Sequence, residues 1–379
     1  MKRLILIVML LMILTTGCAY SMQPEHQAYA ISLSVDRHEN GQLTLGIQVP
    51  RIGGSPAVDE ESPTGTPASS YAVFSATTPS FTECLDLLRA TVPYSVRLSQ
   101  LRSIVFGESL AREASFAQLV KEIAMTNYLN TSAIAIVCRA NALNFLNEQH
   151  PAIGVRLSSS VVAELEHYHK NGYVPYTRLF DLFSSNNSIY SDSVLTLAAT
   201  ENPAKTTPLP AKSMGEALPG ALPRTGDNKN QYMGCAMMRN GQMVGELDGK
   251  LTQYLEILLH ETGGLSYVSG GRGLSLSVKG RPHFSLNLRP DAIDITLTLD
   301  MTATPLTDLP DLTILQRQIE EDLRTLITIC QAHGVEPFKL SEYAAKHFLT
   351  VPEFIAYDFR DKFLHADVKI NLTLTPFGP

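Results

Sequence analysis

Residues 232–264, YMGCAMMRNGQMVGELDGKLTQYLEILLHETGG, determine which fold the second half of the chain can form. YMGCAMMR and QMVGEL flank Asn240-Gly241, a pair that favours a tight turn, so this part predicts a β-hairpin. The next part, LTQYLEILLH, predicts a helix that stops at Gly263-Gly264, where glycine can adopt the left-handed conformation. The apolar residues on one face of this helix are Leu251, Tyr254, Leu255, Leu258 and Leu259.

The segments that follow predict a sheet of antiparallel strands and one long helix. Residues 274–280 (LSLSVKG), 283–289 (HFSLNLR) and 291–303 (DAIDITLTLDMTA) alternate apolar and polar residues, as strands with one solvated face do. Residues 310–333 carry apolar residues at helical spacing, and Gly334 follows where glycine commonly ends a helix. A short helix at FRDKF (359–363) and a last strand at 367–376 complete this half.

The first half predicts strands and helices in alternation. A hairpin is expected from strands 29–36 and 42–49 around Asn40-Gly41, followed by a strand at 71–76 and a helix capped by Thr82. The remaining expected strands are 103–106, 133–139 and 194–199, and the remaining expected helices are 108–125, 158–170 and 175–185, the last starting near Pro175. The order strand, helix, strand predicts an α/β unit packed on one sheet.

The fold class that follows is α+β, with mixed sheets and helices in the N-terminal half and an antiparallel sheet with a long helix in the C-terminal half. Residues 201–230 contain five prolines and no periodicity, which is typical of a linker or long surface loop. We therefore expect an N-terminal region at 18–200, which could contain two subdomains, and a C-terminal domain at 231–379.

The composition is that of a folded protein without a nucleic-acid partner. Apolar residues make up 44% and charged residues 18% of the 379 residues, and the net charge is −7. Binding of nucleic acid needs a concentrated basic surface, and the sequence has no run of Lys or Arg. Beyond the first 21 residues no apolar stretch reaches the length of a membrane span.

Residues 1–17, MKRLILIVMLLMILTTG, have the form of a secretion signal. A basic start is followed by the apolar stretch 4–14, which is too short to cross a bilayer. The Gly-Cys ending at Cys18 resembles a bacterial lipobox, in which the Cys thiol receives a diacylglyceryl group and the chain is cut just before it. The mature chain would then begin at Cys18, held to the membrane by its lipid; an ordinary secreted protein in which Cys18 is incidental is the alternative.

The other cysteines and the charged clusters predict no catalytic or metal site. Four cysteines lie far apart among apolar neighbours, without zinc-site spacing, so we expect core residues, with one disulfide as the open alternative: Cys84, Cys138, Cys235 and Cys330. His167 and His169 are two residues apart, so a helix would point them in different directions, and we expect both to be solvated. Residues 320–322 (EED) have arginines nearby and predict a charged outer face, and 269–273 (SGGRG) predicts a turn.

Four segments, in order, resemble the Ger(x)C family, the lipoprotein C subunits of GerA-type nutrient germinant receptors in endospore-forming bacteria. They are the lipid-type signal, the hairpin VDRHENGQLTLGIQVP (35–50), the segment IVFGESLARE (104–113) ahead of a helix, and GCAMMRNGQMVGELDGKLTQYLEILL (234–259). The order and spacing of these segments match the family over nearly the whole mature chain.

The resemblance implies a non-enzymatic receptor subunit without cofactor or metal. It would be anchored through Cys18 at the outer face of the spore inner membrane, with an A subunit and a polytopic B subunit as partners. One alternative is a solute-binding lipoprotein that feeds a transporter, which would need two similar α/β lobes around a cleft. The other is an anchored hydrolase, for which the sequence offers no nucleophile motif.

Overall fold

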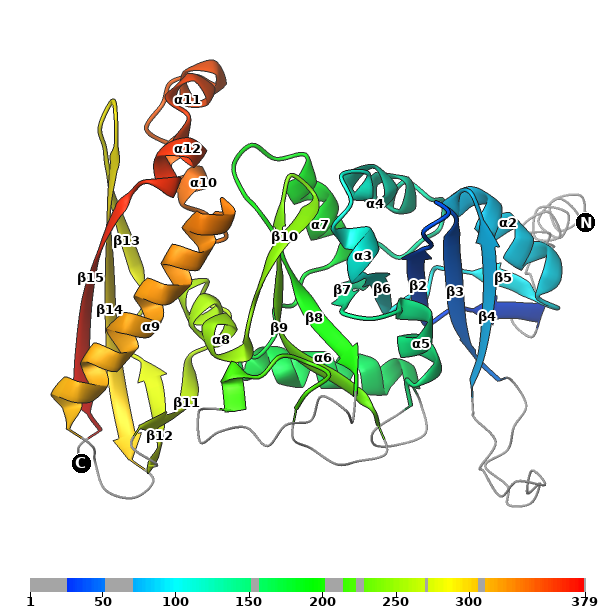
Figure 1. Ribbon diagram of the computed structural model, residues 1–379, viewed down its shortest axis with the longest axis horizontal. Helices are drawn as coiled ribbons and strands as arrows, with labels where there is room; N and C mark the ends of the chain where they lie inside the picture. The colour runs from blue at the N-terminus through cyan, green and yellow to red at the C-terminus, as the bar shows by residue number, and fades with distance from the viewer. Residues whose placement is uncertain are drawn as a thin grey trace, which may run out of the picture.

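The computed structural model of the chain describes residues 26–51, 71–150, 157–201, 214–222, 228–269, 272–305 and 311–377. Two large sheets lie one after the other along the long axis of the molecule, and helices pack against both (Figure 1). The larger sheet belongs mainly to the N-terminal half and the smaller one to the C-terminal half. The predicted α+β fold is confirmed.

The larger sheet has eight strands, in the spatial order β10 (Gln242–Leu247), β9 (Asn230–Arg239), β8 (Val194–Thr200), β7 (Ile134–Cys138), β6 (Ser103–Gly107), β2 (Ser32–Arg37), β3 (Leu43–Pro50) and β4 (Tyr71–Thr78). Its middle four strands are parallel, and two antiparallel strands extend it on each side. Both predicted hairpins are confirmed, as β2–β3 and β9–β10. A separate small sheet pairs β1 (Gln27–Tyr29) with β5 (Ser95–Arg97) in parallel.

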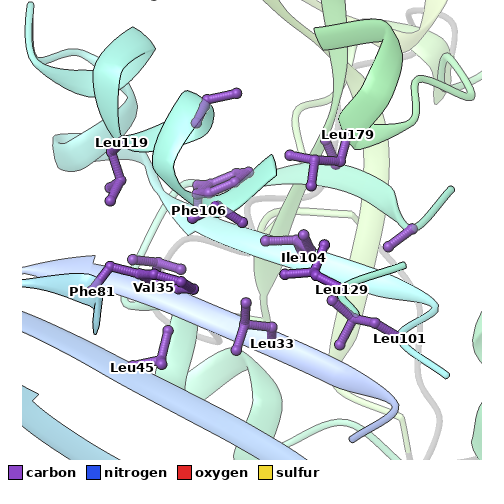
Figure 2. Packing of buried hydrophobic residues seen from close by; sticks show 14 of the residues in the cluster. Leu33, Val35, Leu45, Phe81, Leu101, Ile104, Phe106, Leu119, Leu129 and Leu179 are labelled. Carbon is purple, nitrogen blue, oxygen red and sulfur yellow. The ribbon is translucent and has the colours of Figure 1, made fainter. Parts of the chain in front are cut away.

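Helices cover both faces of the larger sheet. α2 (Phe81–Thr91), α3 (Glu108–Ala111), α4 (Phe116–Ala124) and α7 (Leu179–Asn186) pack on one face, together with Ile104 and Phe106 of β6. α5 (Ala142–Asn147) and α6 (Leu157–Lys170) pack on the other face, with Val105 of β6. Figure 2 shows the first of these cores, in which Leu33, Phe106 and Leu179 come from β2, β6 and α7. Burial on both faces explains why the central strands are continuous apolar runs.

The smaller sheet is built around its long strand. It consists of β11 (Gly264–Ser269), β12 (Arg272–Val278), β13 (His283–Leu288), β14 (Ile293–Pro305) and β15 (Asp367–Pro376). β12 and β13 pair with successive parts of one edge of β14, and β15 pairs along the other. The predicted antiparallel pairing is confirmed for β12, β13 and β14, and β11, which was not predicted as a strand, adds to β12 in the same sense. β15 is parallel to β14, because the chain crosses back through helices before it enters the sheet.

The long helix α9 (Leu312–His333) covers the apolar face of the smaller sheet (Figure 1). It ends as predicted at Gly334, which has a φ of 68°. α8 (Gly249–Leu258) precedes the smaller sheet, and α10 (Leu340–Ala345), α11 (Val351–Tyr357) and α12 (Phe359–Leu364) follow α9. Only α12 of these last three was expected. In the described part of the chain, no helix is long and apolar enough to cross a membrane.

The single helix predicted at 108–125 is wrong. The structure has two helices, α3 and α4, separated by a short turn. Leu110 and Ala111 of α3 are fully buried, as is Phe116 of α4, whereas Ala114 between them is exposed. Each residue turns a helix by about 100°, so one continuous helix could not direct all three buried side chains into the same core.

Three predicted helix ends also differ from the structure. Ser80, not Thr82, caps α2, and its side chain accepts the N–H of Glu83 at 3.2 Å. α7 begins at Leu179 and not near Pro175, because the residues just before it pair with the backbone of β7. α8 stops before His260, which takes the left-handed conformation with a φ of 65°, and Gly264 already begins β11.

The domain boundary predicted at 201–230 separates β8 from β9 along the chain. β9 and β10 belong by sequence to the predicted C-terminal domain 231–379, but they complete the larger sheet, since β9 pairs with β8. The division into 18–200 and 231–379 stays a prediction.

Candidate functional site

The segment 232–264 lies at the junction of the two sheets. One face of the β8–β10 edge packs against α8 and α9, which also cover the smaller sheet (Figure 1). Cys235 and Met237 of β9 and Leu247 of β10 share one buried cluster with Leu326 and Cys330 of α9. An apolar core therefore joins the two halves.

Two glycines of this segment allow the close packing at the junction. Gly234 has a φ of 79°, and a Cβ there would lie 2.2 Å from the carbonyl oxygen of Leu247. A Cβ on Gly245 would lie 2.6 Å from Met237 Cε and 2.9 Å from a ring carbon of His333, at the end of α9. A side chain at either position would separate β10 from its neighbours, and this explains why both positions are occupied by glycine.

A buried ion pair links the two halves beside this core. Asp192, just before β8, has a side chain that is 2% exposed, and it accepts a hydrogen bond of 2.7 Å from Arg360 Nη2 of α12. Its other carboxylate oxygen accepts the backbone N–H of Glu336 at 3.0 Å. Burial raises the pKa of Asp192, while the Glu336 N–H and Arg360 oppose that rise. The charge of Asp192 is therefore compensated by Arg360, which is hydrogen-bonded to it, and by the nearby charge of Arg239.

Glu336 continues the same polar connection into the C-terminal half. It is buried, and its two carboxylate oxygens accept the backbone N–H groups of Leu340 and Ser341 at 3.1 and 3.0 Å, at the start of α10. Burial raises its pKa to about 7. The segment between α9 and α10 is thus organised by a carboxyl group at the junction.

A second ionic contact across the junction involves His169 of α6. His169 Nδ1 lies 3.3 Å from the buried carboxylate of Glu256 of α8, and Nε2 lies 3.6 Å from Glu261. The contact with Glu256 raises the pKa of His169, and burial raises the pKa of Glu256. The prediction that His167 and His169 are both solvated is therefore wrong for His169, because α6 ends against α8; His167 is exposed as expected.

These groups border a cleft of about 620 Å³ between the two halves. His169, Asp192, Glu256 and Lys339 are among its lining residues. Glu256 has the close contact with His169 Nδ1, but its buried Oε2 makes no hydrogen bond among the described residues. Asp192, by contrast, is paired with Arg360 and with the N–H of Glu336 from the opposite half. Such pairing suits a junction that keeps two parts in register better than a reaction centre.

Asp322 on α9 does not belong to a charged outer face. It accepts hydrogen bonds from the hydroxyls of Tyr254 at 3.2 Å and Tyr267 at 3.1 Å, and Lys250 Nζ lies 2.9 Å away. These contacts tie α9 to α8 and β11. The prediction is therefore wrong for this residue, since it turns toward α8, while Glu321 is exposed as expected.

The motif IVFGESL has a structural explanation in the N-terminal half. Asp36 of β2 is buried and accepts the N–H groups of Ala142 and Leu143 at 2.8 and 2.9 Å, at the start of α5. Burial raises the pKa of Asp36, and these two N–H groups oppose the rise. A Cβ on Gly107 would lie 2.5 Å from Asp36 Oδ1, so the glycine leaves room for this carboxylate.

The predicted site residues have mixed outcomes. Cys18 and the signal 1–17 lie outside the described residues. The four other cysteines are buried and unbridged, which confirms them as core residues: Cys84, Cys138, Cys235 and Cys330. Burial raises the thiol pKa of Cys138 and Cys235 to about 12. Among the residues that the structure describes, no group of three or more His, Cys, Asp or Glu side chains could hold a metal ion.

The sequence carries no motif for the junction residues. Asp192 contacts Glu336 and Arg360 across 144 and 168 residues of chain. Asp192 and Glu336 are single charges in irregular segments, and Arg360 lies on the short helix α12, so local periodicity contains no information about such distant partners. The only usable signal was the position of Glu336 in the apolar context HGVEPF.

Comparison with known proteins identifies the family. The model of the spore germination protein N-terminal domain matches residues 21–200, and the spore germination B3/GerAC-like C-terminal model matches residues 233–375. No curated protein matches the chain. The crystal structure of the GerBC protein is similar to it, with a TM-score of 0.53 and 15% identity over 91% of this chain and 97% of that chain. At this identity the likeness shows the fold alone, but the two family models together cover most of the sequence, and the chain therefore belongs to the GerAC-like family of spore germination proteins.

Proposed function

We propose that this chain is a lipid-anchored, non-enzymatic subunit of a nutrient germinant receptor complex that is needed to trigger spore germination. The observation that carries the proposal is that the N-terminal and C-terminal germination models follow each other along one chain, at 21–200 and 233–375. The corresponding domains would be 18–200 and 231–379, joined through 201–230.

Cys18 is the proposed attachment site, at the outer face of the spore inner membrane. The signal-like residues 1–17 and the Gly-Cys ending support this assignment. Two acyl chains give stable anchoring, because each buried methylene contributes roughly 0.8 kcal/mol. The A subunit and the polytopic B subunit of the receptor are the proposed partners.

A role without catalysis is supported by the state of the polar groups described above. The thiols of Cys84, Cys138, Cys235 and Cys330 are buried, and reactive thiols are partly exposed with a lowered pKa. The carboxylates at the junction accept N–H groups or pair with cations of the opposite half. Their contacts are made within the chain, between its two halves.

The test combines localisation with capture of the complex from spores. Cys18→Ala should release the chain from spore membranes and impair germination in nutrients, whereas the neighbouring variant Ser21→Ala should do neither. Capture of the wild-type chain from solubilised spore membranes should bring down the A and B subunits. Retention of the Cys18→Ala chain on the membrane would exclude the anchor, and capture without either subunit would exclude the receptor assignment.

A further inference from the structure

We propose that a surface at the N-terminal end of the molecule rests on the lipid bilayer. This membrane-facing surface consists of Tyr94, Met125 and Tyr128, with Arg89 and Arg97 beside the last two. The proposal rests on attachment through Cys18, proposed above, and adds which part of the folded chain meets the lipid.

The apolar residues of this surface are exposed: Met125 and Tyr128 line one groove, and Tyr94 directly precedes Ser95 of its lining. Tyr128 is 81% exposed, Met125 63% and Tyr94 45%. Met125 and Tyr128 line a groove of about 700 Å³ together with Arg89 of α2, Arg97 of β5 and one carboxylate, Glu122 of α4, which accepts a hydrogen bond from the Thr82 hydroxyl at 2.9 Å. Single exposed apolar residues are common, but a group of them beside one groove indicates a contact surface.

The backbone holds Tyr128 outward in an unfavourable conformation. Its φ is 61°, a region that residues other than glycine rarely occupy. The loop around it is fixed, because the N–H of Asn130 donates to the carbonyl of Leu98 at 3.1 Å and its side-chain amide donates to that of Leu101 at 2.8 Å. A strained residue whose ring gains no burial in the folded chain is best explained by a contact outside it.

The length of the tether places this surface near the lipid. Gln27 follows Cys18 by nine residues, which can span at most about 30 Å when fully extended. Gln27 pairs with Ser95 in the β1–β5 sheet, and Ser95 also lines the groove. The exposed apolar residues of α11, such as Ile355, lie at the opposite end of the long axis from the N-terminal strands (Figure 1). The tether therefore favours the groove, and not α11, as the part that meets the bilayer.

The side-chain chemistry matches the headgroup region of a bilayer. Tyrosine is enriched at membrane interfaces, where its ring lies among acyl chains and its hydroxyl among headgroups. Arg and Lys can bury their aliphatic stems while their charged ends reach phosphates. Because Arg89 also pairs with Asp86 at 3.2 Å, we expect the rings and Met125 to supply most of the contact and the cations to orient it.

The test measures the distance of labelled positions from lipid in the full, lipidated chain. The chain is reconstituted in vesicles of equal parts phosphatidylcholine and phosphatidylglycerol that carry headgroup nitroxide lipid. A fluorophore is attached at Tyr128→Cys or, as the matched control, at Ile355→Cys. Labelling is selective because Cys18 is acylated and the other four cysteines are buried. We expect quenching at position 128 to exceed that at 355 by about threefold or more.

The outcomes separate this surface from the anchor. A chain that does not float with the vesicles overturns the anchor and this proposal with it. A chain that floats but shows equal quenching at both positions overturns the membrane-facing surface and leaves the anchor intact. If the fluorescence at position 128 changes only after the A and B subunits are added, and not on binding to vesicles, the surface contacts a protein partner and its assignment to lipid is overturned.

Discussion

Arg360→Ala should destabilise the protein, because it removes the cation that is hydrogen-bonded to buried Asp192 and leaves only the electrostatic influence of Arg239. Removing one partner of a buried ion pair typically costs about 3–5 kcal/mol. Asp192 is 2% exposed and its bond with Arg360 is 2.7 Å long, so it falls in the buried class, while Arg360 itself is 25% exposed. Asp192 also keeps the N–H of Glu336. We therefore expect the lower end of that range, about 3 kcal/mol at neutral pH.

Urea denaturation of the intact chain measures this loss. The control is Arg324→Ala, at an exposed position of α9, which should change the free energy of unfolding by less than about 0.5 kcal/mol. The pH dependence adds a second test. Burial already raises the pKa of Asp192, and loss of Arg360 raises it further, so protonation relieves the variant in acid. The destabilisation should therefore be smaller at about pH 5 than at about pH 7.

A double-mutant cycle completes this prediction. In an Asp192→Asn background, Arg360→Ala should cost about 1 kcal/mol or less, because the buried charge is gone. If Arg360→Ala alone lowers the free energy of unfolding by less than about 1 kcal/mol, the ion pair contributes no more than a solvent-exposed pair does. Such a small loss, or an equal loss from Arg360→Ala in the wild-type and Asp192→Asn backgrounds, would refute the conclusion that Arg360 stabilises the fold by compensating the buried charge of Asp192.

Three further predictions use the same denaturation assay. Gly107→Ala should cost about 2 kcal/mol, because its Cβ would lie 2.5 Å from Asp36 Oδ1, whereas Gly263→Ala, with open space around it, should be nearly neutral. Burial raises the pKa of Glu336 from 4.5 to about 7, so the folded state binds its proton more tightly than the unfolded state does. The contribution of Glu336 to the free energy of unfolding therefore falls as the pH rises from 4.5 to about 7. Glu336→Gln should make the free energy of unfolding depend less on pH in this range. His169 has a pKa raised above 6.5, so its ionic contribution is present in full below that pH and lost as pH rises through the folded value; His169→Gln should destabilise more at about pH 6 than at about pH 9. An unchanged pH dependence for Glu336→Gln, or a His169→Gln effect independent of pH, would contradict the assigned contacts.

The sequence predicts elements whose signals are local. Asn240-Gly241 takes positive φ at both positions, as its hairpin requires, and Gly334 ends the longest helix. The apolar runs of β6 and β7 reflect burial on both faces of the sheet. Each of these signals depends on backbone geometry or periodicity within a few residues.

Errors arose where tertiary contacts override local pattern. The break between α3 and α4 lets two differently directed sets of apolar residues reach one core. Asp322 has the sequence context of a solvated helix face, but two tyrosine hydroxyls and Lys250 surround it. The ion pair of Asp192 with Arg360 joins segments 168 residues apart, so no local pattern could reveal it.

Pairing of β8 with β9 determines where two relatives could be recombined. A chimera joined within 201–230 would have to match the β8 edge of one parent to the β9 edge of the other over their whole register. The apolar side chains of β9 and β10 would also have to pack against helices α5 and α7 of the other parent. A junction at 260–263, between α8 and β11, leaves the eight-stranded sheet entirely from one parent. Exchange of C-terminal parts at this second crossover point preserves the strand pairing of the larger sheet, and the parents must instead match at the apolar core and the Asp192–Arg360 pair that join the two halves.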